Sequence, residues 1–235
     1  MGVLFGDDGS RRGSSKKPVC RSEMILLFFS EGCSREVHLH LKLEKVKVSG
    51  VELILASGSP RRRDLLAREG VKFEVQVSGI EELAPNALEP VSLARENALM
   101  KARDIFIRNV GATVLGADTV VVVDGRTLGK PKDLVEGAEM LRLLSGRWHE
   151  VVTGVALLSR TCEEVFHETT RVRFKVLWEE EIADYHARVH VLDKAGGYAI
   201  QDGGERIIAE VEGCRDNVMG LPVERVVDEL TQISK

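Results

Sequence analysis

The segment that most constrains the fold is VELILASGSPRRRDLLAREG, residues 51–70. Its apolar first half predicts a buried strand, and the small residues at 57–60 predict a turn. The proline of this turn and the stop at Gly70 frame a helix. The start of such a helix exposes unpaired N–H groups and the positive end of its dipole. The arginines at 61–63 therefore either form a solvated surface turn or bind an anion.

Strand and helix patterns alternate along the rest of the chain. Strands are predicted at 51–57, 72–79, 112–118, 119–125, 149–160, 165–177 and 205–213, and helices at 60–70, 90–109, 134–146, 179–189 and 221–233. The segments 149–160 and 165–177 are expected to pair as a β-hairpin. Helices mixed with hairpin-like strands favour an α/β or α+β fold with a mixed sheet over a strictly parallel one.

Composition excludes several classes of protein. The 235 residues are 43% hydrophobic and 30% charged, as in a soluble globular chain. The net charge of -4 argues against a dedicated nucleic-acid binder, and 5% aromatic residues leave little for base stacking. The apolar run MILLFF at 24–29 is too short to span a bilayer. The four cysteines are widely spread without a C-x-x-C pair, which fits a reducing compartment and predicts a cytoplasmic protein.

The first 50 residues differ from the rest. The polar, Gly/Ser-rich stretch GDDGSRRGSSKKP predicts an N-terminal extension over residues 1–50 that is partly disordered. A basic stretch followed by MILLFF leaves a targeting signal as the alternative, although Asp7 and Asp8 count against a transit peptide. The regular pattern begins after Gly50, so residues 51–235 are expected to form the functional domain.

Asp118 is an unusual residue for its surroundings. It stands between two apolar, β-branched segments, where a charge needs a partner or a metal ion. An aspartate that caps a turn between two strands is one interpretation. A metal ligand or general base at a rigid strand end is the other, and the residue alone does not decide between them.

Four further features are ambiguous when taken singly. Glu81 and Glu82 follow a predicted strand, and Lys101 lies within a predicted helix. Asp193, Lys194 and Gln201 surround a glycine-rich turn that allows close backbone approach to a ligand. Lys130 lies in GRTLGKP, which resembles a P-loop but has three residues between its glycines and a proline where magnesium needs Ser or Thr. Together, basic groups, carboxylates and glycine-rich strand ends suit a metal-bound polyphosphate.

The ordered set of motifs resembles the Maf family from about residue 51 to the C-terminus. These motifs are LILASGSPRRRDLL, GIEE, MKAR, VLGADTVVVVDGRTLGKP, MLRLLSGRWHEVVTGVAL, LDKAGGYAIQ and GLPV. The resemblance implies a nucleoside triphosphate pyrophosphatase that cleaves the bond between the α- and β-phosphates with Mg²⁺ or Mn²⁺. It also implies an elongated mixed α/β fold related to inosine triphosphatase, with two lobes around a cleft, and a homodimer. No nucleic-acid or membrane partner is expected.

The resemblance assigns roles to nine residues. The expected catalytic residues are Asp118, as proton acceptor, Glu82, Lys101 and Lys130. The expected metal ligands are Asp118 and Glu82. The expected substrate-binding residues are Ser57, Arg61, Arg62, Thr119 and Gln201. Arg63 is expected to be an exposed helix residue.

The helix lysine of the family has two possible matches. Aligning LAREN with the family's usual LAREK places Asn97 at the lysine position, which would be a loss. The spacing from Glu82 and the Ala-Arg that follows favour Lys101 instead.

The segment DKAGGYAIQ resembles the branch of the family that acts on dTTP and UTP, in which Arg61, Thr119 and Gln201 match specificity positions. Gly79 stands where an aspartate is common, and Gly-Cys-Arg replaces the usual Gly-Ser-Tyr near residue 214, which leaves the base preference open. The alternative function is a non-catalytic, nucleotide-binding regulator of cell division.

Overall fold

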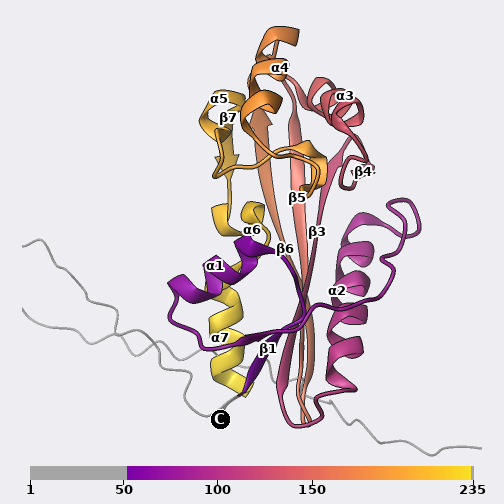
Figure 1. Ribbon diagram of the computed structural model, residues 1–235, viewed down its shortest axis with the longest axis vertical. Coiled ribbons are helices and arrows are strands. Elements are labelled where there is room, and N and C mark those ends of the chain that lie inside the picture. Colours follow the sequence, from indigo (N-terminus) through magenta and orange to yellow (C-terminus); the bar gives the residue numbers. More distant parts are fainter. Residues whose placement is uncertain (1–51, 234–235) are drawn as a thin grey trace, which may run out of the picture. The chain divides into compact units, whose positions relative to one another are not determined.

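The structure is a computed structural model that describes residues 52–233, and the predicted extension of residues 1–50 lies outside them. Within the described residues, one mixed sheet has the strand order β2-β1-β3-β5-β6-β7, with β4 paired to β3 (Figure 1). The strands are β1 (Leu53–Leu55), β2 (Glu74–Val75), β3 (Thr113–Val123), β4 (Arg126–Leu128), β5 (Trp148–Leu158), β6 (Glu163–Phe174) and β7 (Ile208–Glu212). The helices are α1 (Pro60–Arg68), α2 (Pro90–Phe106), α3 (Leu134–Leu144), α4 (Glu179–Arg188), the 3₁₀ turn η1 (Ala195–Gly197), α5 (Gly204–Ile207), α6 (Arg215–Met219) and α7 (Val223–Ile233).

The sheet is mixed, as the alternation of elements predicts. Strand β1 runs parallel to both β2 and β3, whereas β3, β5, β6 and β7 pair in antiparallel fashion. The predicted hairpin of β5 and β6 is confirmed, with residues 148–158 paired to residues 163–173. None of the helices within residues 52–233 is long and apolar enough to cross a membrane.

The predicted and observed strands differ at three places. The segments 112–118 and 119–125 form one continuous strand, β3, because its antiparallel ladder with β5 extends without a break from Val114 to Val122. Asp118 is therefore in the middle of a strand, and the interpretation of it as a turn cap is wrong. Strand β2 covers only two residues of 72–79, and 205–213 begins as helix α5 before β7 starts at Ile208.

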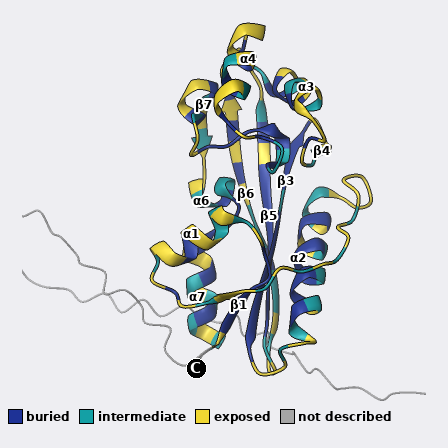
Figure 2. Cartoon of the chain, in the orientation of Figure 1, coloured by how far each residue is buried: buried dark blue, intermediate teal, exposed yellow. Residues whose placement is uncertain are grey.

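Helices cover the two faces of the long strands differently. Alternate residues of a strand point to opposite faces. On β3, Val114, Val120 and Val122 pack against α2, which runs along one face. On the opposite face Leu115 packs with α1 and α7, and Val121 packs with α3 and α4. Figure 1 shows α3 and α4 toward one end of the long strands and α1 and α7 toward the other, and Figure 2 shows β3 and β5 buried along most of their length.

The middle of β3 lacks a neighbouring strand on one side. Strand β1 pairs with β3 only as far as Leu115, and β4 begins to pair with it at Val121. Between these positions, no strand in the described part of the chain pairs with that edge, whereas β5 covers the other edge throughout. Asp118 and Thr119 lie in this interval. An open strand edge between two helix groups is where the fold leaves room for a ligand.

Candidate active site

A cavity of about 380 Å³ lies at this open edge, which is within the range of about 300–1,000 Å³ usual for small-molecule sites. All nine residues predicted to act on the substrate line it: Ser57, Arg61, Arg62, Glu82, Lys101, Asp118, Thr119, Lys130 and Gln201. Its lining contains five basic and three acidic residues, so its net charge is positive. The roles of the nine residues stay predictions, but the structure brings them to one place.

The start of helix α1 forms one wall. Ser59 is its N-cap, and the Ser59 hydroxyl accepts a hydrogen bond from the Arg62 backbone N–H. The Arg62 guanidinium donates to three acceptors in three segments: Ser57 Oγ at 3.0 Å, Thr119 Oγ1 at 3.0 Å and the Gly220 carbonyl at 2.8 Å. A planar guanidinium with fixed N–H directions suits such a set of acceptors, and an ammonium does not. Arg62 therefore joins α1, β3 and the loop after α6.

The other arginines of this turn have different surroundings. Arg61 donates to the Asp193 carboxylate at 2.8 Å and to the Asp193 backbone carbonyl at 3.3 Å. Arg63 is exposed and does not line the cavity, in line with its assignment to the helix surface. Gln201 lines the cavity, and its amide donates to Asp202 at 3.0 Å.

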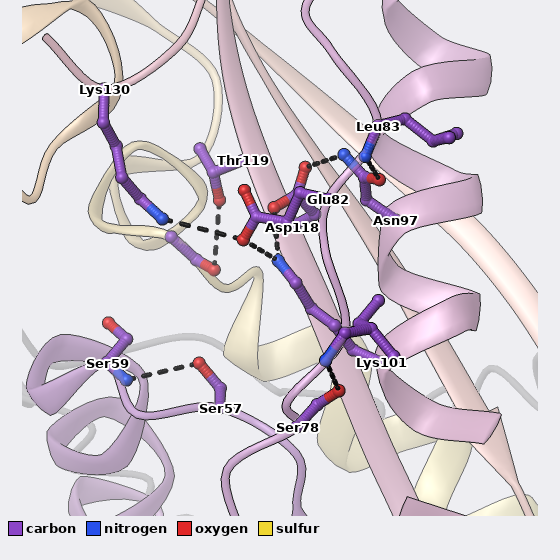
Figure 3. Close-up of polar contacts among 12 residues, drawn as sticks. Ser57, Ser59, Ser78, Glu82, Leu83, Asn97, Lys101, Asp118, Thr119 and Lys130 are labelled. Atoms are coloured by element: carbon purple, nitrogen blue, oxygen red, sulfur yellow. Dashed lines mark hydrogen bonds and ion pairs between the residues drawn. The ribbon is translucent and has the colours of Figure 1, made fainter. Parts of the chain in front are cut away.

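The opposite wall holds a buried polar cluster (Figure 3). Asp118 is only 6% exposed and Lys101 is 9% exposed. Lys101 Nζ lies 2.6 Å from Asp118 Oδ1, and Asn97 Nδ2 donates to Asp118 Oδ2 at 3.1 Å. A buried carboxylate needs partners of this kind, since isolated burial of a charge is very costly. Asn97 and Lys101 thus both contact Asp118. Both possible matches to the family's helix lysine therefore belong to this polar cluster.

Close packing of α2 on the sheet explains how these side chains meet. Asn97 and Lys101 are four residues apart and lie on one face of α2. A Cβ atom at Gly154 would overlap the backbone of Ala94 in α2, and Gly154 is the cross-strand partner of Asp118. Gly116, two residues before Asp118, approaches the backbone of α2 in the same way. Two glycines therefore let the helix backbone lie directly on the strands beside Asp118.

Glu82 and Lys130 extend the polar cluster around Lys101. Lys101 Nζ lies 2.7 Å from Glu82 Oε1, so the ammonium lies between the two predicted metal ligands. Lys130 Nζ lies 3.6 Å from the same Glu82 oxygen and is largely exposed. Partial burial acts to raise the pKa of Glu82, but Lys101 and Lys130 outweigh it and hold that pKa below its ordinary value. Glu82 is therefore ionised at neutral pH.

A chain of hydroxyl groups extends from the cavity into the core. Thr153, which is fully buried, donates to the Asn217 backbone carbonyl at 3.1 Å. Its hydroxyl lies 3.0 Å from Thr119 Oγ1. Because a hydroxyl has one proton, the Thr119 hydroxyl is the donor in that contact and accepts from Arg62. Thr153 in the core thus orients the Thr119 hydroxyl, which also lies 3.4 Å from the Gly220 carbonyl.

Two carboxylates of the cavity, those of Glu82 and Asp118, could contribute to a divalent-cation site. Within residues 52–233, no three Asp, Glu, His or Cys side chains form a group that could hold a metal ion by themselves. Glu82 and Asp118 offer two carboxylates that share contact with one ammonium. Mg²⁺ is normally held by one or two carboxylates together with substrate phosphates and water. The two carboxylates fit a cation that is bound with its nucleotide.

Sequence reasoning noted two further polar residues of the site without giving them a role, and it missed two others. Asp193 and Lys194, which precede the glycine-rich turn in LDKAGGYAIQ, line the cavity, whereas Thr153 and Asn217 support it from the core. For Thr153 and Asn217 the sequence holds no signal, because an ordinary strand threonine and a helix asparagine acquire partners only through the fold.

Comparisons with known proteins identify relatives over nearly all the described residues. The family described as "Maf-like protein" matches residues 52–233. A dTTP/UTP pyrophosphatase of Symbiobacterium thermophilum is 50% identical over 181 residues, which are 77% of this chain and 93% of that protein. Proteins of the same description from Bacillus cytotoxicus and Bacillus cereus are 48% and 44% identical, over 77% and 83% of this chain and 95% and 96% of their own lengths. Among solved structures, the Ham1 protein of Staphylococcus aureus aligns over 78% of this chain and 100% of its own, with 15% identity and a TM-score of 0.46.

Proposed function

The chain belongs to the Maf-like protein family, and from that premise we propose that it hydrolyses nucleoside triphosphates to the nucleoside monophosphate and pyrophosphate. The proposed substrates are dTTP, UTP and modified pyrimidine analogues, as the names of the relatives at 44–50% identity suggest. The observation that carries the proposal is the placement of the Arg61–Arg62 helix start and the buried Asp118 in one cavity of net positive charge. Such a cavity suits a triphosphate and also holds a base for its hydrolysis.

In the proposed reaction, a water oxygen bonds to the α-phosphorus while the bond from that phosphorus to the bridging oxygen breaks. The pyrophosphate leaves with the bonding electron pair, and the proton of the water goes to Asp118. Each carboxylate oxygen of Asp118 already accepts one hydrogen bond, from Lys101 or Asn97, and keeps a lone pair for the water. These two contacts hold the carboxylate in one orientation, which a general base requires.

The basic residues neutralise the charge that develops on the departing pyrophosphate. Arg61 and Arg62 come from the helix start, and Lys101 and Lys130 come from the opposite wall. Phosphoryl transfer depends mainly on positioning and on charge neutralisation of this kind. Four cations on two sides of the cavity therefore match the needs of a polyphosphate leaving group.

We propose Mg²⁺ or Mn²⁺ as cofactor, held by Glu82 and Asp118. When bound, such an ion lowers the pKa of water and shields the phosphate oxygens. The side chains contribute the rest: Asn97 orients Asp118, and Lys101 contacts both carboxylates and holds them close together.

A non-catalytic nucleotide-binding regulator is the alternative. It would need the arginines and lysines but no oriented carboxylate on the cavity wall. The buried, doubly bonded Asp118 favours the enzyme.

We further propose that the enzyme is cytoplasmic and acts as a homodimer, without nucleic-acid or membrane partners. The spacing of its cysteines supports the compartment. The family resemblance supports the dimer, and the net charge of -4 supports the absence of a nucleic-acid partner.

The test is product analysis with the full chain. The protein is incubated with dTTP, UTP, CTP, GTP, ATP and 5-substituted pyrimidine triphosphates, with MgCl₂, MnCl₂ or EDTA. Nucleotides are separated by chromatography, and pyrophosphate and orthophosphate are assayed separately. We expect monophosphate and pyrophosphate from dTTP and UTP, and no turnover in EDTA. Diphosphate with orthophosphate would place the cleavage at the wrong bond, and tight nucleotide binding without turnover would favour the regulator.

A further inference from the structure

Arg61 is held by a residue far away in sequence. Asp193, 132 positions further along, accepts from Arg61 Nη1 with its carboxylate at 2.8 Å and from Arg61 Nη2 with its backbone carbonyl at 3.3 Å. Two acceptors on one residue fix both the position and the plane of a guanidinium. The Arg61 side chain is 21% exposed, so it is not a freely moving surface arginine.

Asp193 is itself anchored. Its second carboxylate oxygen accepts from Lys194 Nζ at 2.7 Å, and that ammonium also donates to the His190 backbone carbonyl. Lys194 is buried at 7% exposure. Burial acts to raise the pKa of Asp193, but the hydrogen bonds from Lys194 and Arg61 outweigh it and lower that pKa to about 2. The carboxylate is thus charged and shared between a fixed lysine and Arg61.

The two arginines are held by separate segments. Arg62 contacts Ser57, Thr119 and Gly220, and none of these contacts involves the segment that carries Asp193. Arg61 contacts Asp193, which lies between α4 and η1. The position of Arg61 therefore depends on Asp193, and the position of Arg62 does not.

From these contacts we infer that Asp193 is a positioning residue for nucleotide hydrolysis, which acts by holding the Arg61 guanidinium toward the triphosphate. The other N–H groups of Arg61 stay available for phosphate oxygens, since a guanidinium has five donors in a fixed fork. The inference rests on the proposed function. It adds to the site a carboxylate that pairs with Arg61, one of the residues proposed to bind the triphosphate. Asp193 thereby ties the loop after α4 to the start of α1, and residues of both segments line the cavity.

The test is a double-mutant cycle on Arg61 and Asp193. Asp193→Asn has one side-chain acceptor instead of two, so it cannot serve both Arg61 and Lys194 on separate oxygens. We expect Asp193→Asn to lower kcat/KM for UTP about tenfold through misplacement of Arg61. In an Arg61→Gln background the same change is expected to have no further effect, because the group through which it acts is gone. Circular dichroism and thermal melting of each variant verify folding.

Asp184→Asn is the matched control. The Asp184 carboxylate also bridges two cations, Arg188 at 2.8 Å and Arg206 at 3.0 Å, but it lies outside the residues that line the cavity. We expect kcat/KM to be unchanged by this substitution.

The outcomes separate the two proposals. Absence of UTP hydrolysis by the wild-type chain would overturn the proposed function. If the wild type hydrolyses UTP normally, three results would overturn the role of Asp193 alone. These are additive effects in the double-mutant cycle, an unchanged kcat/KM in Asp193→Asn, and tighter nucleotide binding by that variant.

Discussion

The two walls of the cavity are held together by different forces. The Asp118 wall consists of regular elements in direct backbone contact, because Gly116 and Gly154 let α2 lie on β3 and β5. The arginine wall consists of loops and a helix start, which are joined by side-chain hydrogen bonds such as those of Arg61 to Asp193 and of Arg62 to Gly220. The proposed general base, Asp118, is thus positioned by packing, whereas the arginines proposed to bind the triphosphate are positioned by polar contacts. We expect Asp118 to be displaced when the backbone moves, and the arginines to be displaced when one hydrogen-bond donor or acceptor is removed.

The sharpest way to test the Asp118 wall is to change its chemistry without its shape. Asp118→Asn is nearly isosteric but cannot accept a proton from water. We expect kcat for UTP to fall about 10²–10⁴-fold, the usual contribution of an essential base. Steady-state kinetics and a thermal melt measure the loss at constant fold.

The control for this change is Asp124→Asn. Asp124 lies just after the end of β3 and, within residues 52–233, its carboxylate pairs only with exposed Arg147, at 2.8 Å. Asparagine tolerates its positive φ of 49°. This variant is expected to keep wild-type activity. If Asp118→Asn kept near-normal turnover as well, the assignment of Asp118 as base would be wrong.

The next test moves the backbone instead of the chemistry. In Gly154→Ala the new methyl group overlaps the backbone of Ala94, so α2 must shift away from the sheet. We expect a loss of about 3 kcal/mol in the free energy of unfolding from overpacking, measured by urea titration. Because α2 carries Lys101 and Asn97, kcat is also expected to fall in the fraction that remains folded.

Gly111→Ala is the matched change. A Cβ atom at Gly111 has open space around it, and its φ is not positive. We expect stability and kcat close to wild type. Equal stability of the two variants would contradict the account of the packed wall.

Sequence reasoning located the elements of the packed wall better than their continuity. Glycine and aspartate in VLGADT predict an interruption of the strand, yet β3 continues through both. The reason is non-local, because the ladder with β5 pairs every residue from Val114 to Val122. No pattern within residues 112–125 carries that information.

The site shows the same limit in another form. Residues in dense motifs, such as Arg62 and Asp118, were predicted and lie in the cavity. Thr153 was missed, because its role depends on Asn217, 64 positions away. Motifs place chemistry on local elements, whereas the contacts that orient this chemistry come from the packing of distant ones.

A buried histidine, His149, contacts the cavity wall at Tyr198. His149 Nε2 lies 2.8 Å from the hydroxyl of Tyr198, a residue of the cavity wall. Nδ1 of His149 has no hydrogen-bond partner among the described residues. Burial lowers the pKa of His149 to about 4, below its usual 6.5. The unfolded chain therefore binds a proton between these values that the native protein does not.

This linkage predicts how stability depends on pH. As pH falls from about 6.5 toward about 4, the contribution of neutral His149 is lost. Between pH 7 and pH 5, the free energy of unfolding should fall by about 2 kcal/mol more in the wild type than in His149→Gln, which does not titrate. Urea titrations at both pH values measure the difference, and equal slopes in the two proteins would refute the assignment.

The smallest expected effect concerns the hydroxyl chain beneath the arginine wall. Thr153→Val keeps the buried shape but removes the acceptor of the Thr119 proton. The Asn217 carbonyl keeps its bond from the Gly220 N–H at 3.0 Å, so stability should change little. The Thr119 hydroxyl is then left with its longer contact to the Gly220 carbonyl, at 3.4 Å, and we expect kcat/KM for UTP to fall only about threefold, since the Arg62 contacts stay in place.

Thr170→Val separates this effect from a general loss of a buried hydroxyl. Thr170 is equally buried and also contacts Asn217, at 3.0 Å from its amide nitrogen. It makes no hydrogen bond to Thr119 or Arg62 among the contacts of the described residues. We expect Thr170→Val to reduce stability without changing kcat/KM. If both variants lost activity alike, the orientation of Thr119 would not be the cause. The arginine wall would then depend on the packing of the core beneath it, as the Asp118 wall does.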